Sequence, residues 1–341
     1  MHTPETTAPA RRDAPAAVVA GLGTCLPVTE WDNAALTAAL DTSDRWIRTR
    51  TGIAARRRVA AEQSMRDLAQ EAAANAMRSA GVERVGGLVL ATTTPDRPCP
   101  AVAPELAERL GLGHVPAFDI SAVCSGFVYA TATAAALVTS GIVDSVLVVA
   151  AETYSRIVDP ADRATAVLFG DGAGAVVLRR GSAHEEGALL AFDLGSDGGG
   201  KDLIHVPGER EQPTGRRWFT MAGRKTYLRA IEEMSASALR VLKDCAWPPE
   251  SVGAFVPHQA NARIIEAVTD RLGVEPGTAV CELAHVGNTA AASIPLALAD
   301  ALDRGRLRPG ARTVLTAFGG GLTWGSAALT WPHLSAVRTE I

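Results

Sequence analysis

Short runs of aliphatic and β-branched residues alternate along this chain with segments of helical periodicity, and this alternation limits the possible folds more than any other feature. The first half has four such apolar runs, at 16–24, 86–94, 144–152 and 175–180. Strands that are apolar throughout are typical of sheets buried on both faces. Helical patterns at 65–81 and 104–112 lie between them. The sequence therefore predicts an α/β fold built in layers.

The order of these elements repeats in the second half. A strand, a loop of small residues and a long helix occur at 117–141 and again at 279–305. The strand at 144–152 has a counterpart at 312–321, and the segment 252–261 matches an earlier strand and loop. The halves share little identity, so the order of elements carries the repeat and predicts two related units.

We expect a flexible tail at 1–15, a first half at 16–183 that holds a nucleophilic cysteine, and a second half at 184–341. The tail is rich in Pro, Ala and Thr and lacks the regions of a signal peptide. A chain of 341 residues is long enough for two cores. No apolar run approaches the ~18 residues of a membrane span, so no membrane association is expected.

Charge and cysteine content exclude several classes of function. A net charge of −4 argues against general nucleic-acid binding. The five cysteines are odd in number, widely spaced and without a C-x-x-C pair. A disulfide framework and a zinc site are therefore not expected, and a reducing cytoplasm fits best.

Three similar loops carry residues with catalytic chemistry, namely Cys124, His258 and Asn288. Each lies where a predicted strand leads into a helix, which is where ligands bind in open α/β sheets. If a pseudo-two-fold axis relates the halves, these loops converge. We therefore expect the three side chains to form one site.

Each of these residues has a plainer interpretation beside the catalytic one. A helix N-terminus would lower the pKa of the Cys124 thiol and make it a nucleophile. Cysteine is also commonly a small buried hydrophobe, the interpretation kept for Cys25, Cys245 and Cys281. His258 can donate its Nε2–H or shuttle a proton, or it is a structural histidine with satisfied hydrogen bonds.

Asn288 can donate its amide to an oxyanion or cap a helix, and the two roles are compatible. The glycine run at 317–325 lets backbone N–H groups approach a ligand closely, or it forms a tight turn.

These motifs resemble those of the β-ketoacyl-acyl carrier protein synthase III family. The resemblance rests on "DISAVCSGF", "VPHQAN", "VGNTAAASIP", "AFGGGLTWG" and the segments 41–53 and 159–178, which occur in order between about residues 17 and 331. It implies the thiolase fold, a duplicated five-layered αβαβα architecture that agrees with the repeat. It also implies a homodimer.

The resemblance further implies a decarboxylative condensation. Cys124 would accept the acyl group of an acyl-CoA primer, with the oxyanion held by the N–H groups of Cys124 and Gly320. His258 and Asn288 would then stabilise the enolate formed from malonyl-acyl carrier protein as CO₂ leaves. Phe318 matches a phenylalanine packed near the cysteine. No metal or cofactor is expected, because acyl-CoA is a substrate.

Other positions match the family's contacts with coenzyme A and the carrier protein. Trp46 and Arg163 match a pair that sandwiches the adenine, to which both are suited by stacking. Arg50 and Asn261 match contacts to the phosphates and pantetheine, and Arg263 matches a position that docks the acidic carrier. Taken alone, Trp46 would be a core residue and the arginines solvated surface charges.

The sequence departs from the family at the acyl pocket, which Cys99 and Phe169 are expected to shape. Cys99 stands where acetyl-CoA-using members carry a phenylalanine that enters the partner's pocket. A smaller side chain there predicts a longer or branched primer such as propionyl, butyryl or isobutyryl, unless bulk elsewhere compensates. Arg224 and Lys225 depart from smaller or acidic family residues near the pantetheine channel.

Several functions stay open. The enzyme either initiates fatty-acid synthesis or, the interpretation we favour, primes an aromatic polyketide pathway with a non-acetyl starter. A non-condensing acyltransferase on the same fold usually has a changed histidine or asparagine, and both are present here. A papain-like protease would carry a "CGSCW"-type signature near the N-terminus, and a silent dimer partner would lack Cys124.

Overall fold

A computed structural model describes residues 15–341 and contains a six-stranded mixed sheet in the first half. Its strands, in spatial order, are β14 (Val337–Glu340), β1 (Pro15–Leu26), β7 (Asp171–Ser182), β6 (Ser145–Thr153), β4 (Leu88–Ala91) and β5 (Ala117–Ile120). Strands β6, β4 and β5 are parallel, whereas β7 is antiparallel to both of its neighbours. Strand β4 is apolar and buried, and β6 is apolar except at its ends and almost wholly buried, as expected of strands covered on both faces.

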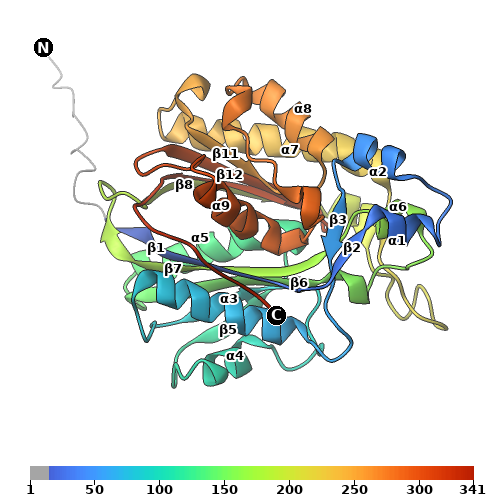
Figure 1. Ribbon diagram of the computed structural model, residues 1–341. Helices are drawn as coiled ribbons and strands as arrows, with labels where there is room; N and C mark the ends of the chain where they lie inside the picture. The colour runs from blue at the N-terminus through green and yellow to red at the C-terminus, as the bar shows by residue number, and fades with distance from the viewer. Residues whose placement is uncertain (1–14) are drawn as a thin grey trace, which may run out of the picture.

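The second half forms a four-stranded sheet in the order β11 (Ala254–Pro257), β12 (Arg312–Gly319), β13 (Thr323–Thr330) and β8 (Leu189–Ser196). Figure 1 shows the two sheets lying one above the other with helices α5 (Gly126–Thr139) and α9 (Ser293–Asp303) between them. Helices α3 (Met65–Ala80) and α4 (Ala103–Arg109) cover the outer face of the first sheet, and α7 (Gly223–Asp244) and α8 (Ala262–Leu272) cover that of the second. The predicted five-layered αβαβα architecture is therefore confirmed.

The predicted repeat is also present. The first half runs β1, α3, β4, α4, β5, α5, β6, β7, and the second runs β8, α7, β11, α8, α9, β12, β13. One expected strand is almost missing, because the segment near 279 pairs with β11 only through the bridge between Phe255 and Ala279. The chain then turns into the 3₁₀ segment Leu283–His285, which prevents a longer ladder.

Helix α5 is made mostly of small residues, which suits its place between the two sheets. Eight of the residues of α5 are buried, most of them Ala, Val, Gly or Thr. A Cβ atom on Gly126 would lie 3.1 Å from the Cβ of Ala91 and 3.3 Å from that of Ala291. The start of α5 thus packs closely against both halves of the chain, which fixes the position of Cys124 just before it.

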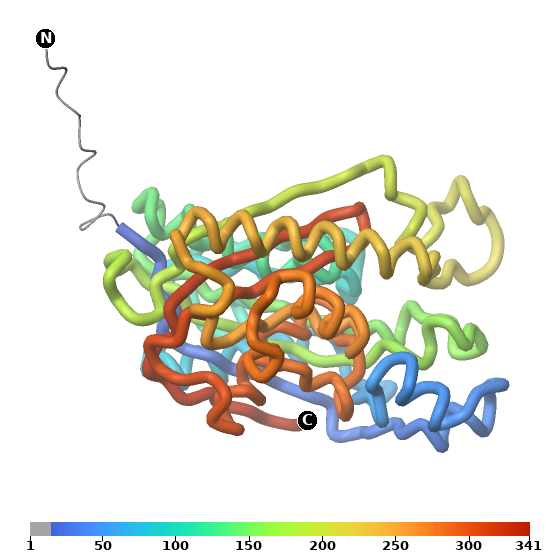
Figure 2. Tube along the Cα trace, turned by 90° about the horizontal axis from the view of Figure 1, so that it is seen from above, coloured from blue at the N-terminus to red at the C-terminus, as the bar shows by residue number. Residues whose placement is uncertain are grey.

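The remaining short elements gather at one end of the molecule. They are β2 (Glu30–Asp32), α1 (Asn33–Thr37), α2 (Asp44–Thr51), β3 (Ala55–Arg57), α6 (Arg163–Ala166), β9 (Ile204–His205) and β10 (Thr220–Met221). Figure 2 shows the segments around 30–60, 155–165 and 205–220 together at the end opposite the start of β1. Strand β14 leaves the second half and pairs in parallel with β1, with Val337 opposite Gly23.

The predicted tail at 1–15 lies outside the described residues except for Pro15, which begins β1. Of the helices between residues 15 and 341, none has the length and apolar character needed to cross a bilayer.

Candidate active site

A cavity of about 600 Å³ opens between the two halves and gathers most of the predicted site residues. Those that line it are Trp46, Arg50, Cys124, Phe169, His258, Asn261, Arg263, Asn288 and Phe318. Arg163 contacts Trp46 at its edge, with the guanidinium 4.4 Å from the indole centroid. Arg163, Cys99 and Gly320 are the predicted residues that do not line this cavity.

Cys124 lies in the 3₁₀ turn Val123–Ser125, which leads directly into α5. Its side chain is buried, and burial, reinforced by the nearby Glu152 carboxyl, raises the pKa of the thiol well above its ordinary value. The prediction that the helix terminus lowers this pKa is wrong for the free enzyme, because loss of water outweighs the partial charge of the helix. Cys124 is therefore a thiol until substrate arrives.

Glu152 is a fully buried carboxyl that the sequence did not mark as functional. It accepts hydrogen bonds from the Thr93 N–H at 3.0 Å and the Thr94 hydroxyl at 2.8 Å. Burial raises its pKa to about 8, against the lowering effect of these bonds. Glu152 thus ties the loop after β4 to the end of β6 beneath the cysteine.

His258 follows β11 and is only 2% exposed. Its backbone N–H donates to Thr316 O at 2.7 Å, and its Nδ1 lies 2.7 Å from Ser293 Oγ. Burial lowers the pKa of the imidazole to about 3, so His258 is neutral at physiological pH. With Nδ1 engaged by Ser293 on the far side of the ring, the neutral imidazole offers Nε2 to the cavity.

Asn288 is fixed by contacts with the first half of the chain. Its backbone N–H donates to Leu168 O at 2.9 Å, and its carbonyl accepts from the Gly170 N–H at 3.0 Å. The side-chain Oδ1 accepts from the Ala290 N–H at 2.9 Å. Both predicted roles are compatible here, because the Oδ1 caps the following turn and the amide NH₂ remains as a donor on a residue that lines the cavity.

The glycine run follows β12 and packs against the cysteine. A Cβ on Gly319 would lie 2.7 Å from the backbone nitrogen of Cys124, so only glycine allows this approach. Phe318 and Cys124 belong to one buried apolar cluster. Gly320 follows directly and packs against Ile204.

Three aromatic rings form one wall near the cysteine. Phe169 stacks on Tyr154 with centroids 4.6 Å apart, and Phe219 packs edge-on against both, at 5.0 Å from Phe169 and 5.4 Å from Tyr154. Phe169, Phe219 and Ile204 line the cavity. Only Phe169 was predicted from the sequence, because the other two come from segments with no motif.

The mouth of the cavity is basic. Arg50, Arg263 and Arg224 are exposed and line it, and Arg263 also lies 5.6 Å from the ring centroid of Tyr227. Asn261 caps α8 through a 3.0 Å bond from the Ile264 N–H. A phosphorylated ligand would meet positive charge here.

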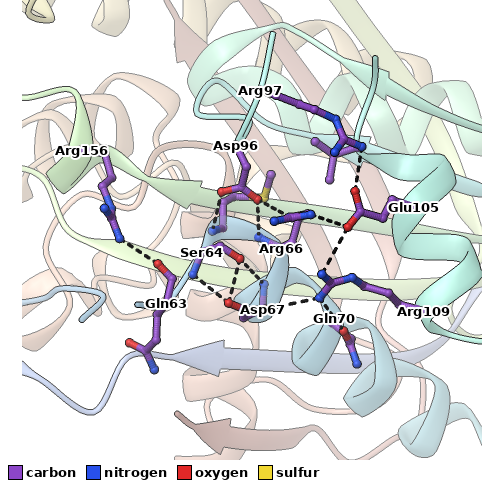
Figure 3. A network of polar contacts seen from close by, with 12 residues as sticks. Gln63, Ser64, Arg66, Asp67, Gln70, Asp96, Arg97, Glu105, Arg109 and Arg156 are labelled. Atoms are coloured by element: carbon purple, nitrogen blue, oxygen red, sulfur yellow. Dashed lines mark hydrogen bonds and ion pairs between the residues drawn. The ribbon is translucent and has the colours of Figure 1, made fainter. Parts of the chain in front are cut away.

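Cys99 is exposed on a loop that is held firmly away from this chain's own cavity. Asp96, in the same loop, accepts from the N–H of Met65 at 3.2 Å and from Arg66 Nε at 2.7 Å, at the start of α3. Glu105 of α4 binds both Arg66 and Arg97. Figure 3 shows this network, which fixes the loop on two helices.

The other cysteines differ in burial. Cys25 is buried in the first core, as expected, whereas Cys281 is exposed because it lies where the chain leaves the second sheet.

Sequence reasoning missed two groups beside the predicted residues. Ser293 lies inside the quoted "GNTAAASIP" motif, five residues after Asn288, and that position was a usable signal. Glu152 ends a predicted apolar strand, where a charged residue is unusual.

Two parts of the chain match known family descriptions. Residues 118–198 match 3-oxoacyl-[acyl-carrier-protein] synthase III, and residues 242–331 match the C-terminal part of the same enzyme. The β-ketoacyl-[acyl-carrier-protein] synthase III 5 of Streptomyces coelicolor is 55% identical over 331 residues, which cover 94% of this chain and 99% of that protein.

Comparison with solved structures points to the same family. The crystal structure of 3-oxoacyl-(acyl carrier protein) synthase III from Pseudomonas aeruginosa PAO1 superposes with a TM-score of 0.90 and 52% identity, covering 94% of this chain and 99% of that one. The priming β-ketosynthase from the R1128 polyketide biosynthetic pathway superposes with a TM-score of 0.88 and 33% identity, covering 96% of this chain and 99% of that one. With this identity over nearly its whole length, the chain belongs to the β-ketoacyl-[acyl-carrier-protein] synthase III family, condensing acyltransferases of the thiolase fold.

Proposed function

We propose that this enzyme loads an acyl group from acyl-CoA onto Cys124 and condenses it with malonyl-acyl carrier protein. The observation that carries the proposal is the convergence of Cys124, His258 and Asn288 on one cavity with an apolar wall and a basic mouth. A buried thiol, a neutral imidazole and an amide are the groups that acyl transfer and enolate stabilisation require.

In the loading step, the Cys124 sulfur bonds to the thioester carbonyl carbon and the bond from that carbon to the CoA sulfur breaks. The thiol proton ends on coenzyme A. The N–H groups of Cys124 and Gly320 hold the oxyanion. Trp46 and Arg163 bind the adenine, and Arg50 and Asn261 contact the phosphates and pantetheine, in keeping with their place at the mouth.

In the condensation step, the bond between the malonyl carboxylate and its α-carbon breaks, CO₂ leaves, and the electron pair forms an enolate. His258 and Asn288 donate hydrogen bonds to the enolate oxygen. The enolate carbon attacks the acyl carbonyl on Cys124 and the carbon–sulfur bond breaks, which gives β-ketoacyl-carrier protein. The Cys124 thiolate that leaves takes a proton from solvent and becomes a thiol again. Arg263 docks the acidic carrier at the exposed mouth.

The starter is an acyl group larger than acetyl, for polyketide or fatty-acid synthesis. Support comes from the apolar lining of Phe169, Phe219 and Ile204 and from the 33% identity to a polyketide priming ketosynthase. Cys99 acts in the pocket of the partner subunit in a homodimer. Its exposure on an anchored loop, away from its own cavity, supports this arrangement.

Intact-mass measurement with a mixture of acyl-CoAs tests loading. We expect one acyl adduct, lost in Cys124→Ala, and a preference for propionyl or larger groups that moves toward acetyl in Cys99→Phe. No adduct with any acyl-CoA would refute the synthase reaction. An adduct without CO₂ release from malonyl-carrier protein would instead support a non-condensing acyltransferase.

A further inference from the structure

The imidazole of His258 is held from behind by a serine that no motif assigns a role. Ser293 is the first residue of α9 and is 2% exposed, and its Oγ lies 2.7 Å from His258 Nδ1. It does not line the substrate cavity, whereas His258 does. The two ring nitrogens of an imidazole point in diverging directions, so the engagement of Nδ1 with Ser293 leaves Nε2 for the substrate.

The hydrogen-bond partners of Ser293 determine which way this bond runs. The Gln259 N–H lies 3.3 Å from the same Oγ and must donate to it. Within residues 15–341, Oγ has no other hydrogen-bond partner, so Nδ1 is the acceptor within reach of its proton. If Nδ1 carried the proton instead, the buried hydroxyl would receive two donors and leave its own proton without an acceptor.

The Gln259 peptide is itself fixed. Its side-chain amide donates to Pro257 O at 2.6 Å and Val280 O at 3.1 Å, and its Oε1 accepts from the Glu282 N–H at 2.9 Å. These three side-chain bonds anchor Gln259 and help to keep its backbone N–H directed at Ser293.

We propose that Ser293 is a positioning residue that donates to His258 Nδ1 and so holds the imidazole as its Nε2–H tautomer. This tautomer presents a donor to the substrate cavity, as the proposed enolate stabilisation requires, and the inference rests on that proposed function. The opposite tautomer would present a lone pair to the thioester oxygen and repel it.

The competing acceptor for the serine proton would be a water molecule in a small cavity of about 30 Å³ beside Ser293. The cavity is the size of one water molecule. Gln259, Glu282, Thr289 and Asp300 also line it, and the Thr289 hydroxyl is buried without a hydrogen-bond partner among residues 15–341. A water that took the serine proton would leave the proton of His258 on Nδ1.

Nitrogen NMR on the free wild-type enzyme distinguishes the Nε2–H from the Nδ1–H tautomer of His258. With ¹⁵N-histidine labelling, two-bond proton–nitrogen spectra report which ring nitrogen is protonated, and a His258→Gln sample assigns the signals. We expect Nε2 protonated and Nδ1 unprotonated, without conversion to the charged form between pH 6 and 8. Protonation at Nδ1 would overturn the proposal.

Kinetics of the separate steps test the function of the bond. We expect Ser293→Ala to lower CO₂ release from malonyl-carrier protein by roughly tenfold to a hundredfold, a loss of the size seen when metal-ligating histidines lose the partner that orients them. The rate of Cys124 acylation should stay within about twofold. Ser293→Thr keeps the hydroxyl, and its extra methyl group can occupy the small cavity beside residue 293. This variant should restore most of the CO₂ release.

Thr289→Val is the matched control, since it removes a buried hydroxyl from the same cavity without touching His258. Wild-type CO₂ release in Ser293→Ala would overturn the proposal, as would an equal loss in Thr289→Val. If the wild type itself released no CO₂, the proposed function would fail, and the NMR spectrum would still decide the tautomer.

Discussion

The guanidinium of Arg163 lies 4.4 Å from the centroid of the Trp46 indole, in direct cation–π contact. An adenine sandwiched between them needs about 3.5 Å on each face, or roughly 7 Å in all. If the adenine of coenzyme A binds between them as proposed, the exposed Arg163 must move outward. Such binding would exchange one cation–π contact for two stacking contacts.

Replacing Trp46 by alanine should weaken binding of the acyl donor and leave the chemistry intact. Loss of one aromatic stacking contact is worth about 1–3 kcal/mol, so we expect the KM for acyl-CoA to rise about tenfold to a hundredfold with little change in kcat. Initial-rate measurements with varied acyl-CoA check this. Trp31→Ala is the control, because Trp31 carries a similar cation–π contact with Arg58 at 4.2 Å but does not line the cavity. An unchanged KM in Trp46→Ala would contradict the adenine site.

Asn288→Asp should separate loading from condensation. An aspartate oxygen can still accept from the Ala290 N–H, so the loop is preserved. The amide donor is lost and a carboxylate faces the enolate, so we expect CO₂ release to fall by about 10²–10³ while acylation of Cys124 continues. Intact mass and CO₂ measurement report the two steps. Parallel loss of both would show that Asn288 serves the loading step as well.

Glu152→Gln should change how stability depends on pH. The native carboxyl has a pKa of about 8, whereas its ordinary value is 4.5. Between these values the native state holds a proton that the unfolded state releases, so the wild type loses stability as pH rises through this window, by roughly 5 kcal/mol in all. Glutamine does not titrate, so the Glu152→Gln variant should not lose stability in this way as the pH rises.

Urea unfolding at pH 5.5 and pH 8.5 measures the effect, with Glu266→Gln on the exposed face of α8 as the control for a lost charge. The stability of Glu152→Gln relative to wild type should increase with pH. The variant should also show Cys124 alkylation by iodoacetamide at lower pH, since the carboxylate raises the pKa of the thiol. A pH-independent stability difference would be evidence against a raised pKa in Glu152.

Phe219→Ala should widen the range of starters. Its ring packs edge-on against Phe169 and Tyr154 and lines the cavity, so its removal creates space in the proposed acyl pocket. We expect longer acyl-CoAs to compete better for Cys124, at a cost of roughly 3–5 kcal/mol in stability. Competition read by intact mass checks the preference. Phe192→Ala removes a ring that packs against a different core cluster, so it should leave the preference unchanged.

The main features of the fold and site could be predicted because they depend on local patterns. Apolar strands, helical periodicity and their repeated order predict the layers, and loops at equivalent places in a repeat converge by symmetry. Strand β14 could not be predicted in this way. It pairs with β1 across more than 300 residues of chain, and no local pattern in Val337–Glu340 specifies so distant a partner.

The chemistry of the site divides in the same way. The sequence by itself determined which residue types meet: a cysteine, a histidine and an asparagine in motif loops, with arginines and a tryptophan near them. Only the tertiary structure decided their protonation and orientation. The pKa of Cys124 is set by burial and by Glu152, and His258 Nδ1 is engaged by Ser293 from the start of α9. Desolvation and hydrogen-bond direction depend on neighbours distant in sequence, so they exist only once the two halves have packed.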